Sequence, residues 1–307
     1  MSATKRLIVC GGNGFLGSRI CKAAISRGWD VTSIRYLRSS PNPFDAFSLR
    51  SQSRSGEPQW KHVTATSSPP DWAHRVSWER ADIFRPVQYV SLLQGADYVI
   101  HTMGILLEAD YKGVISGKES PFSGLAKAFS NAKGHTPNPL ERKDGDELKP
   151  PSSAHQVTYE MMNRDSAILL AKEAANAKVG TFGYVSAAAG APVLPSRYIT
   201  TKREAEQTIA DEFPQMRSIF FRPPFLYDSS RPFTVPLAAA TAAGSLVNGL
   251  TGGVLGGFLG AAVTKPLKAD LVADAVVEAL HDENVKGPIE VPQLEELASK
   301  SWRKTML

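Results

Sequence analysis

The sequence predicts an α/β protein built on a doubly wound parallel sheet, with a smaller C-terminal lobe. Short apolar runs alternate with segments of helical periodicity along most of the chain, which is the pattern of consecutive βαβ units. A glycine-rich turn separates the first apolar run from the first helical segment, where doubly wound sheets hold a ligand. With 307 residues, of which 42% are hydrophobic and 21% charged, the chain can bury a sizeable core.

The first unit is expected to run strand, turn, helix, strand. Its strands are Arg6 to Cys10 and Trp29 to Ile34, its turn is Gly11 to Gly17, and its helix is Ser18 to Arg27. Four later apolar runs have the length of buried strands: Val76 to Trp78, Tyr98 to His101, Phe182 to Ser186 and Ser218 to Arg222. Four further segments carry apolar residues at helical spacing: Pro86 to Leu93, Glu160 to Asn176, Ser196 to Glu212 and Lys268 to His281.

We expect one domain over residues 1–292, with two polar insertions and a tail at 293–307. Residues 35–70 are rich in Ser, Pro and Arg, and residues 110–155 are rich in Lys, Gly, Pro and Asn. Structureless segments of this length are uncommon inside a compact domain, so both insertions are expected on the surface. Residues 223–265 are expected to form an apolar lid within the C-terminal lobe.

Residues 232–264 contain no charged residue and no histidine. A membrane-spanning helix, a buried helix and an apolar lid or membrane-facing loop are the three alternatives. A spanning helix needs about 20 mostly apolar residues, whereas this segment is rich in glycine and alanine and poor in large aliphatic side chains. We therefore expect a lid or loop that makes peripheral contact with a membrane.

The composition narrows the class of ligand. The net charge is +5 and the pI is near 9.1, which is compatible with a phosphate-bearing ligand or an anionic membrane. The basic residues are dispersed and no aromatic strip accompanies them, so we expect no nucleic-acid partner. The two cysteines, Cys10 and Cys21, fall in a segment expected to be core, which is typical of a reducing compartment. No grouping of His, Cys and acidic residues has metal-ligand spacing, so no metal site is expected.

The turn after the first strand predicts a dinucleotide site. One glycine of such a turn permits the tight bend, another lets the backbone approach a pyrophosphate, and a third lets the helix pack close to the strand. The helix N-terminus then faces the phosphate charge. The expected cofactor-binding residues of this turn are Gly11, Gly12, Asn13, Gly14, Phe15, Leu16 and Gly17.

The end of the second strand predicts NADP(H) rather than NAD(H). An NAD-selective site carries Asp or Glu there, whereas this chain carries Arg35, or Arg54 if residues 35–52 are left out. An arginine pairs with a 2′-phosphate that a carboxylate would repel; a solvated surface arginine is the alternative. Asp82 and Ile83 follow the third strand and suit the adenine, with Asp82 accepting a hydrogen bond from its amino group; an exposed turn residue is the alternative.

Tyr198 and Lys202 stand four residues apart on a predicted helix, so they share one helix face. A tyrosine can act as a general acid toward a carbonyl only if its pKa, ordinarily about 10, is lowered. A neighbouring protonated lysine lowers it by stabilising the phenolate. Ser186 ends the preceding strand and is expected to hold the substrate oxygen. A packed tyrosine beside a solvated lysine is the alternative.

These motifs together resemble the short-chain dehydrogenase/reductase superfamily, in its extended or atypical branch, over about residues 5–292. The resemblance implies a Rossmann fold, with Tyr198 as catalytic acid/base, Lys202 as its activator and Ser186 as the substrate-oxygen ligand. It also implies cofactor contacts for Tyr198, Lys202, Met103, Gly104, Arg222 and Pro223. Asn163 is a possible proton-relay member, with an ordinary helix-face asparagine as the alternative. His101 is expected to be satisfied by the backbone at the end of a buried strand.

Four strings more narrowly resemble the fungal mitochondrial member associated with coenzyme Q biosynthesis: Gly11 to Gly17, Gly104 to Glu108, Thr158 to Asn163 and Tyr198 to Glu206. The last three strings are the more diagnostic ones. A more distant resemblance is to the nucleotide-binding accessory subunit of respiratory complex I. The closer one implies a mitochondrial location on the matrix side of the inner membrane, although no clear presequence precedes the first strand. It also implies a place among the subunits of the ubiquinone-synthesis complex.

Two functions from different classes follow. In the first, the protein is an NADP-dependent oxidoreductase or isomerase acting on a hydrophobic carbonyl or quinone-like molecule, possible quinone precursors included. In the second, it is a catalytically silent, nucleotide-binding structural or regulatory subunit. The intact Ser186, Tyr198 and Lys202 favour the enzyme, whereas the uncharged segment 232–264 and the resemblance favour the subunit.

Overall fold

The computed structural model describes residues 3–36, 56–60, 63–64, 66–105, 139–141, 158–188, 196–228 and 265–306. Several predictions concern other parts of the chain. Arg54, the uncharged segment 232–264, and most of the insertions 35–70 and 110–155 lie outside these ranges.

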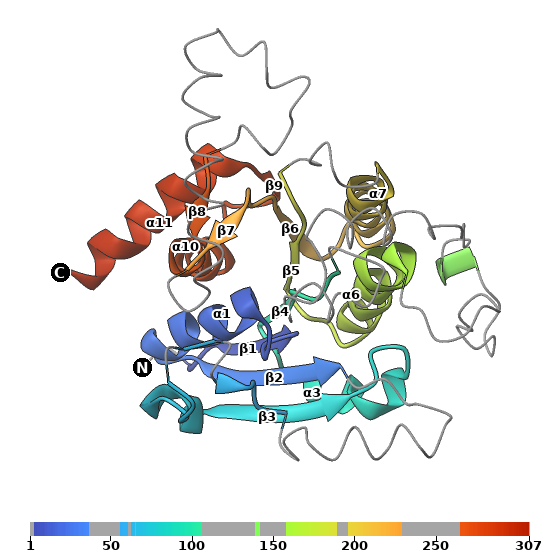
Figure 1. The fold of residues 1–307 in the computed structure, drawn as a ribbon. Helices are drawn as coiled ribbons and strands as arrows, with labels where there is room; N and C mark the ends of the chain where they lie inside the picture. The colour runs from blue at the N-terminus through green and yellow to red at the C-terminus, as the bar shows by residue number, and fades with distance from the viewer. Residues whose placement is uncertain are drawn as a thin grey trace, which may run out of the picture.

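Seven parallel strands form the central sheet, in the order β3-β2-β1-β4-β5-β6-β9 (Figure 1). Their bounds are β1 Arg6–Cys10, β2 Asp30–Tyr36, β3 Val76–Ala81, β4 Tyr98–His101, β5 Thr181–Val185, β6 Arg217–Phe221 and β9 Gly287–Ile289. The doubly wound fold class is therefore confirmed. The strand order reverses at β1, which pairs with β2 on one side and β4 on the other. In such sheets the ligand binds at this reversal, beyond the carboxyl ends of the strands.

Helices cover both faces of the sheet (Figure 1). One face packs against α1 (Phe15–Ser26), α10 (Ala269–His281) and α11 (Val291–Thr305). The other packs against α3 (Val90–Leu93), α6 (Ser166–Asn176) and α7 (Ser196–Glu212). Short elements complete the described chain: η3 Asp71–Arg75, η4 Pro86–Gln88, η5 Pro139–Glu141, η6 Glu160–Asp165, and the two-residue strands β7 Leu226–Tyr227 and β8 Leu267–Lys268.

Most predicted elements appear with small shifts at their ends, and α7 has the predicted bounds. The helix expected over 86–93 is instead the 3-10 turn η4 followed by the single-turn α3, because the Tyr89 backbone at φ −135° separates them. The helix expected over 160–176 begins with the π-helical turn η6 and becomes α-helical at Ser166.

The segment 293–307, expected to be a tail, forms most of α11 instead. Leu294, Leu297 and Ala298 are buried against the same core as α10. A capping box starts the helix: the Glu290 side chain accepts from the backbone of Gln293, and the Gln293 side chain accepts from the backbone of Glu290. The apolar positions at helical spacing carry enough buried surface to dock this helix onto the domain.

Part of the insertion 35–70, which was expected on the surface, packs against the sheet. Trp60 and Val63 are buried together with Ala73. The Trp60 ring meets Trp72 edge-on, with ring centroids 5.5 Å apart, and Trp78 of β3 likewise at 5.8 Å. Aromatic rings of this size bury enough apolar surface to hold the segment in place.

A buried carboxylate joins three helices on the α1 face. Glu278 of α10 is fully buried and lies 2.9 Å from Arg27, at the end of α1, and 2.7 Å from Lys304 of α11. Lys300 approaches it at 3.7 Å and pairs with Asp282 at 2.5 Å. Burial raises the pKa of Glu278, but the hydrogen bond from Lys304 and the charge of Arg27 lower it by more, so it is ionised in the folded protein.

Glu278→Gln is expected to reduce the free energy of unfolding by about 3 kcal/mol, because it removes the shared partner of three cations. Urea unfolding at pH 7 measures this loss. A carboxylate with a lowered pKa stabilises the fold above its unfolded pKa and loses that contribution as the pH falls. The difference from wild type should therefore shrink below the ordinary glutamate value of 4.5. The exposed Glu296→Gln is the control; equal stability of both variants at pH 7 would contradict the role of Glu278.

Candidate functional site

The glycine turn brings α1 onto the ends of β1 and β4. Gly11 has φ +91°, and a Cβ there would lie 2.7 Å from Thr102 Oγ1 and 2.9 Å from Met103 Cγ. A Cβ on Gly17 would collide with the carbonyl oxygen of Gly11. Neither position has room for a side chain, so the glycines are required by the close approach of helix and strands.

Gly14 is the exposed member of the turn and caps α1. A Cβ on it would meet only Gly11 O, at 3.1 Å, so its outer side is open. The first turn of α1 contains no acidic residue and its cap makes no side-chain hydrogen bond. Its N–H groups and the positive end of the helix dipole therefore suit a phosphate.

The other predicted members of the turn differ in exposure. Gly12 is packed against Ser33 and Cys21, so no side chain fits there. Asn13 and Phe15 are half-buried at the surface of the turn. Leu16 packs into the core beneath α1. The core position of Leu16 leaves its backbone, and not its side chain, for any cofactor contact.

Two arginines lie next to each other where β2 and β3 end. Arg35 and Arg80 are paired in register across these parallel strands. Arg35 donates a long hydrogen bond of 3.5 Å to Glu57 O. Burial and the charge of Arg80 both lower the pKa of Arg35. Arg80 was missed from the sequence; a basic residue near the end of the third strand is the signal that points to it.

Asp82 and Ile83 follow β3 but serve the fold in different ways. The Asp82 carboxylate accepts a hydrogen bond from Phe84 N at 3.0 Å and lies 3.9 Å from Arg85, while the backbone N–H of Asp82 donates to Gln88. The Ile83 side chain is fully buried in the core. The buried side chain of Ile83 leaves only its backbone for a cofactor contact.

The loop after β4 borders the exposed end of the site. Met103 is buried against Gly11, whereas Gly104 is exposed. A Cβ on Gly104 would lie 3.4 Å from Lys202 Nζ and 3.0 Å from Asn163 Oδ1. The Asn163 amide accepts from Ile105 N at 3.0 Å and donates to Ile105 O at 3.3 Å. Asn163 thus holds the loop beside Lys202.

Tyr198 and Lys202 are brought together on α7, with Lys202 Nζ 5.8 Å from the centre of the Tyr198 ring. Lys202 is 4% exposed and donates to Val185 O at 3.1 Å, directly before Ser186. The Tyr198 ring also meets Tyr159 edge-on, with centroids 5.9 Å apart. Tyr198, Lys202 and the end of β5 therefore meet at the carboxyl edge of the sheet.

The expected lowering of the Tyr198 pKa is wrong for the protein without ligands. Burial raises the pKa of Tyr198 to about 12, and the nearby Arg203 only partly opposes this. Burial also lowers the pKa of Lys202 to about 7, with Glu206 opposing and Arg203 adding to that shift. Because Lys202 is then only partly protonated near neutral pH, its charge does not compensate for the burial of the phenol.

Ser186 is 4% exposed, and its hydroxyl accepts a hydrogen bond of 2.9 Å from Arg203 Nη1. Arg203 follows Lys202 on α7, and its second amino group donates to Ala187 O at 2.7 Å and Ala188 O at 3.1 Å. Arg203 was not predicted from the sequence; its position next to Lys202 is the signal that points to it.

Arg222 and Pro223, expected at the cofactor, are occupied by contacts within the protein. Arg222 pairs with Glu206 of α7 and, at 2.6 Å, with Glu290, the cap of α11. These two carboxylates raise its pKa against the effect of burial. Pro223 is buried, and its carbonyl accepts from Ala188 N at 2.9 Å. The Arg222 guanidinium therefore acts as a clamp between α7, β6 and α11.

His101, expected to be satisfied by the backbone, also has a side-chain partner. Its Nε2 lies 2.8 Å from Ser166 Oγ, which donates to Met162 O at 2.9 Å across the π-helical turn. Burial and the nearby Lys202 lower the pKa of His101 to about 3, so the ring is neutral.

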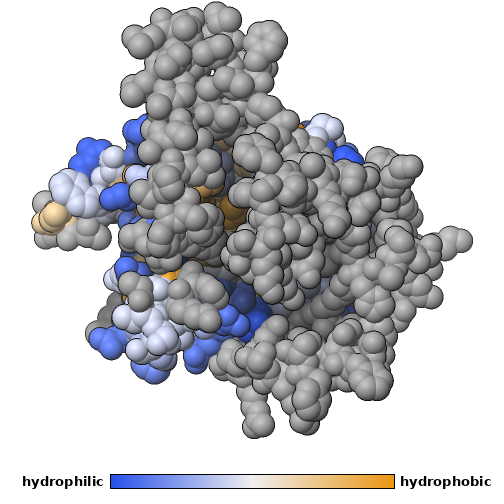
Figure 2. Space-filling model, viewed as in Figure 1, coloured by the Kyte–Doolittle hydropathy of each residue, from blue (hydrophilic) through white to orange (hydrophobic). Residues whose placement is uncertain are grey.

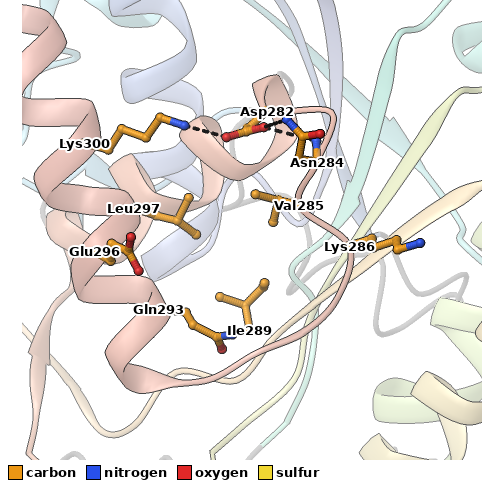
Figure 3. Close-up of a pocket in the computed structure, with 9 residues that line it drawn as sticks. All are labelled: Asp282, Asn284, Val285, Lys286, Ile289, Gln293, Glu296, Leu297 and Lys300. Carbon is orange, nitrogen blue, oxygen red and sulfur yellow. Dashed lines mark hydrogen bonds and ion pairs between the residues drawn. The ribbon is translucent and has the colours of Figure 1, made fainter.

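A separate pocket of about 300 Å³ lies between the loop after α10, β9 and α11 (Figure 3). The ion pair of Asp282 and Lys300 lies on one side of it, and Val285, Ile289 and Leu297 provide its apolar wall (Figure 3). None of its lining residues belongs to the glycine turn, and none of them is Ser186, Tyr198 or Lys202.

Few other features of the described surface bear on function. Figure 2 shows mostly hydrophilic residues on the described part of one face, with hydrophobic residues toward the middle of the molecule. Within the described ranges, no group of three His, Cys, Asp or Glu side chains is arranged to hold a metal ion. No helix in those ranges combines the length and apolar character needed to cross a bilayer.

Comparison with known proteins agrees with this geometry. MIOREX complex component 2 of Saccharomyces cerevisiae is 36% identical over 239 residues, which cover 74% of each chain. An uncharacterized chloroplastic protein of Arabidopsis thaliana is 35% identical over 101 residues, or 33% of this chain and 25% of its own. The solved structure of Pal from Bacillus thuringiensis matches with a TM-score of 0.50 at 13% identity, covering 96% of this chain and 83% of that one, which shows the fold.

The sequence model of the NAD dependent epimerase/dehydratase family matches residues 7–110, which contain β1, the glycine turn and α1. Together with the yeast relative, this match confirms the resemblance to the extended short-chain dehydrogenases. The chain belongs to the NAD dependent epimerase/dehydratase family of NAD(P)-binding Rossmann-fold proteins.

Proposed function

We propose that the protein binds NADP(H) and reduces or oxidises a hydrophobic carbonyl or quinone-like substrate in ubiquinone biosynthesis. The observation that carries the proposal is the meeting of the open Gly14 turn and the Tyr198–Lys202 pair at one edge of the sheet. The loop after β4 connects them, because Met103 packs on Gly11 and Gly104 lies beside Lys202. A dinucleotide in extended form spans such an edge.

The preference for NADP(H) is supported by Arg35 and Arg80. Their side-by-side positions at the ends of β2 and β3 concentrate positive charge. Burial and the charge of Arg80 lower the pKa of Arg35, and a dianionic phosphate would be attracted to both guanidinium groups. Two guanidinium groups match the geometry of a phosphate better than that of a ribose hydroxyl.

The chemistry proposed for the site is proton transfer beside hydride transfer. The nicotinamide of a bound cofactor supplies or accepts the hydride. Tyr198 is the group that gives its proton to the substrate oxygen or takes it back, and Ser186 binds the same oxygen. Lys202 donates a hydrogen bond to Val185 O and lies near the Tyr198 ring. When Lys202 is protonated, its charge can stabilise the Tyr198 phenolate.

The proposed location is the matrix side of the mitochondrial inner membrane, among the subunits of the ubiquinone-synthesis complex. The resemblance of four strings to the fungal coenzyme Q member supports this, and the yeast relative is itself named as a component of a complex. Peripheral membrane contact through residues 232–264 remains part of the proposal.

A catalytically silent, nucleotide-binding subunit is the second candidate. A specific observation favours it: the pKa of Tyr198 is raised to about 12, and that of Lys202 is lowered to about 7. A phenol with so high a pKa is a weak proton donor at neutral pH. Bound cofactor would then stabilise the fold, by roughly 3 kcal/mol at about 100 times its Kd, without turnover.

Arg35→Ala and Arg80→Ala are each expected to weaken binding of NADPH by about 10-fold or more, because each removes a charge-assisted contact to phosphate. Binding of NADH should change by less than about twofold, since it lacks that phosphate. Isothermal titration of the purified variants with both cofactors measures the two effects.

Gly14→Asp is the control for the site as a whole, because a carboxylate at the cap of α1 would repel the pyrophosphate. It should abolish stabilisation by either cofactor in thermal unfolding. Equal losses of NADPH and NADH affinity in the arginine variants would contradict the NADP(H) preference. No shift of wild type with any nucleotide would contradict the cofactor site.

Tyr198→Phe separates the two candidates. If the protein is an enzyme, turnover should fall by about 10²-fold to 10⁴-fold, because the proton donor is lost. Cells in which this variant replaces the native copy should then contain less ubiquinone. NADPH should still raise the unfolding temperature, since the phenol is not needed for phosphate binding.

Tyr98→Phe is the matched control, because Tyr98 lies at the opposite end of β4 from the site. It should support normal ubiquinone content. If cells with Tyr198→Phe also have a normal ubiquinone content, this result contradicts the enzymatic function and favours the silent subunit.

A further inference from the structure

Arg203 makes an unusual set of contacts for a surface-facing helix residue. Its two terminal amino groups donate to a hydroxyl, a carboxylate and two carbonyls. The carboxylate belongs to Glu206, whose Oε1 lies 2.6 Å from Arg203 Nη1. The hydroxyl and the carbonyls belong to three consecutive residues, Ser186, Ala187 and Ala188. The planar guanidinium therefore holds the whole turn that leaves β5.

The contact with Ser186 determines which way the serine can act. The Ser186 oxygen accepts a hydrogen bond from Arg203, so the hydroxyl hydrogen can be donated to another acceptor. Hydrogen bonds from a charged donor polarise the hydroxyl and make it a stronger donor in turn. A hydroxyl prepared in this way suits an oxygen that accepts, such as a carbonyl, quinone or oxyanion oxygen.

Arg203 is itself held from behind. Glu206, one turn further along α7, is 4% exposed and shared between Arg203 and Arg222. Arg222 in turn reaches Glu290 at the start of α11. This chain of ion pairs fixes the guanidinium, since moving it would leave the buried Glu206 with one partner fewer.

We propose that Arg203 is a positioning residue, which holds Ser186 as a hydrogen-bond donor toward a carbonyl-type substrate oxygen. The proposal rests on the proposed function, because it assigns the substrate side of the same site. It narrows the substrate class to molecules that present an oxygen acceptor, and it gives the clamp between α7, β6 and α11 a role in substrate binding.

A double-mutant cycle tests the proposal. Binding of 2-methyl-1,4-naphthoquinone to the NADP⁺-loaded full chain is measured by quenching of tryptophan fluorescence. Wild type is compared with Ser186→Ala, Arg203→Ala and the double variant. Each single substitution should weaken quinone binding by about fivefold to 10-fold, the effect of one hydrogen bond. The double variant should bind the quinone at most about twofold more weakly than Ser186→Ala does, because Arg203 acts through the serine.

Arg203→Lys distinguishes position from charge. Lysine keeps the charge but lacks the fork, so it should weaken quinone binding as much as alanine does. Arg164→Lys is the matched control, because Arg164 also lies against α7, at 3.0 Å from Glu204, without contacting Ser186. It should bind the quinone like wild type.

The outcomes separate this inference from the proposed function. The positioning role is overturned if Arg203→Ala weakens quinone binding as much in the Ser186→Ala background as in wild type. It is also overturned if Arg203→Lys binds the quinone like wild type. NADP⁺ binding without quinone binding by wild type would overturn the substrate class. If wild type does not bind NADP⁺ in thermal unfolding, the proposed function fails and this inference fails with it. Variants that retain wild-type NADP⁺ affinity are thereby shown to be folded.

Discussion

The close approach of α1 to the ends of β1 and β4 is the constraint on which the candidate site depends. It requires hydrogen in place of a side chain at Gly11 and Gly17, where a Cβ would meet Thr102 or the Gly11 carbonyl. Thr102 fixes the other side, since its hydroxyl donates to Cys10 O at 2.9 Å. This contact places the start of α1 against the loop after β4, and Gly104 of that loop lies beside Lys202.

The other half of the site depends on charge rather than on close packing. Arg203, Glu206, Arg222 and Glu290 connect the turn after β5 to the first turn of α11. Each buried carboxylate or half-buried guanidinium in this series has a partner, which is the condition for such groups to be tolerated at low exposure. The turn after β5 is therefore firmly connected to the first residues of α11.

Local pattern in the sequence predicted the fold and the glycine turn well, because both depend on periodicity and on residues adjacent in the chain. Strands such as Tyr98 to His101 were predicted because buried strands are short, continuous apolar runs. The packing of Trp60 and of α11 was missed, since it depends on contacts between segments far apart. Arg80 and Arg203 were missed for the same reason. The pKa of Tyr198 was predicted in the wrong direction, because burial depends on the folded surroundings and not on spacing along α7.

We propose that the glycine turn, Tyr198 and Lys202 form one site for one dinucleotide. Hydrogen–deuterium exchange with and without NADPH tests it most directly. We expect slower exchange of peptides covering both residues 11–18 and residues 198–203 in the same titration. Protection confined to residues 11–18, or the absence of any change, would contradict a single site that joins the two ends of this edge of the sheet.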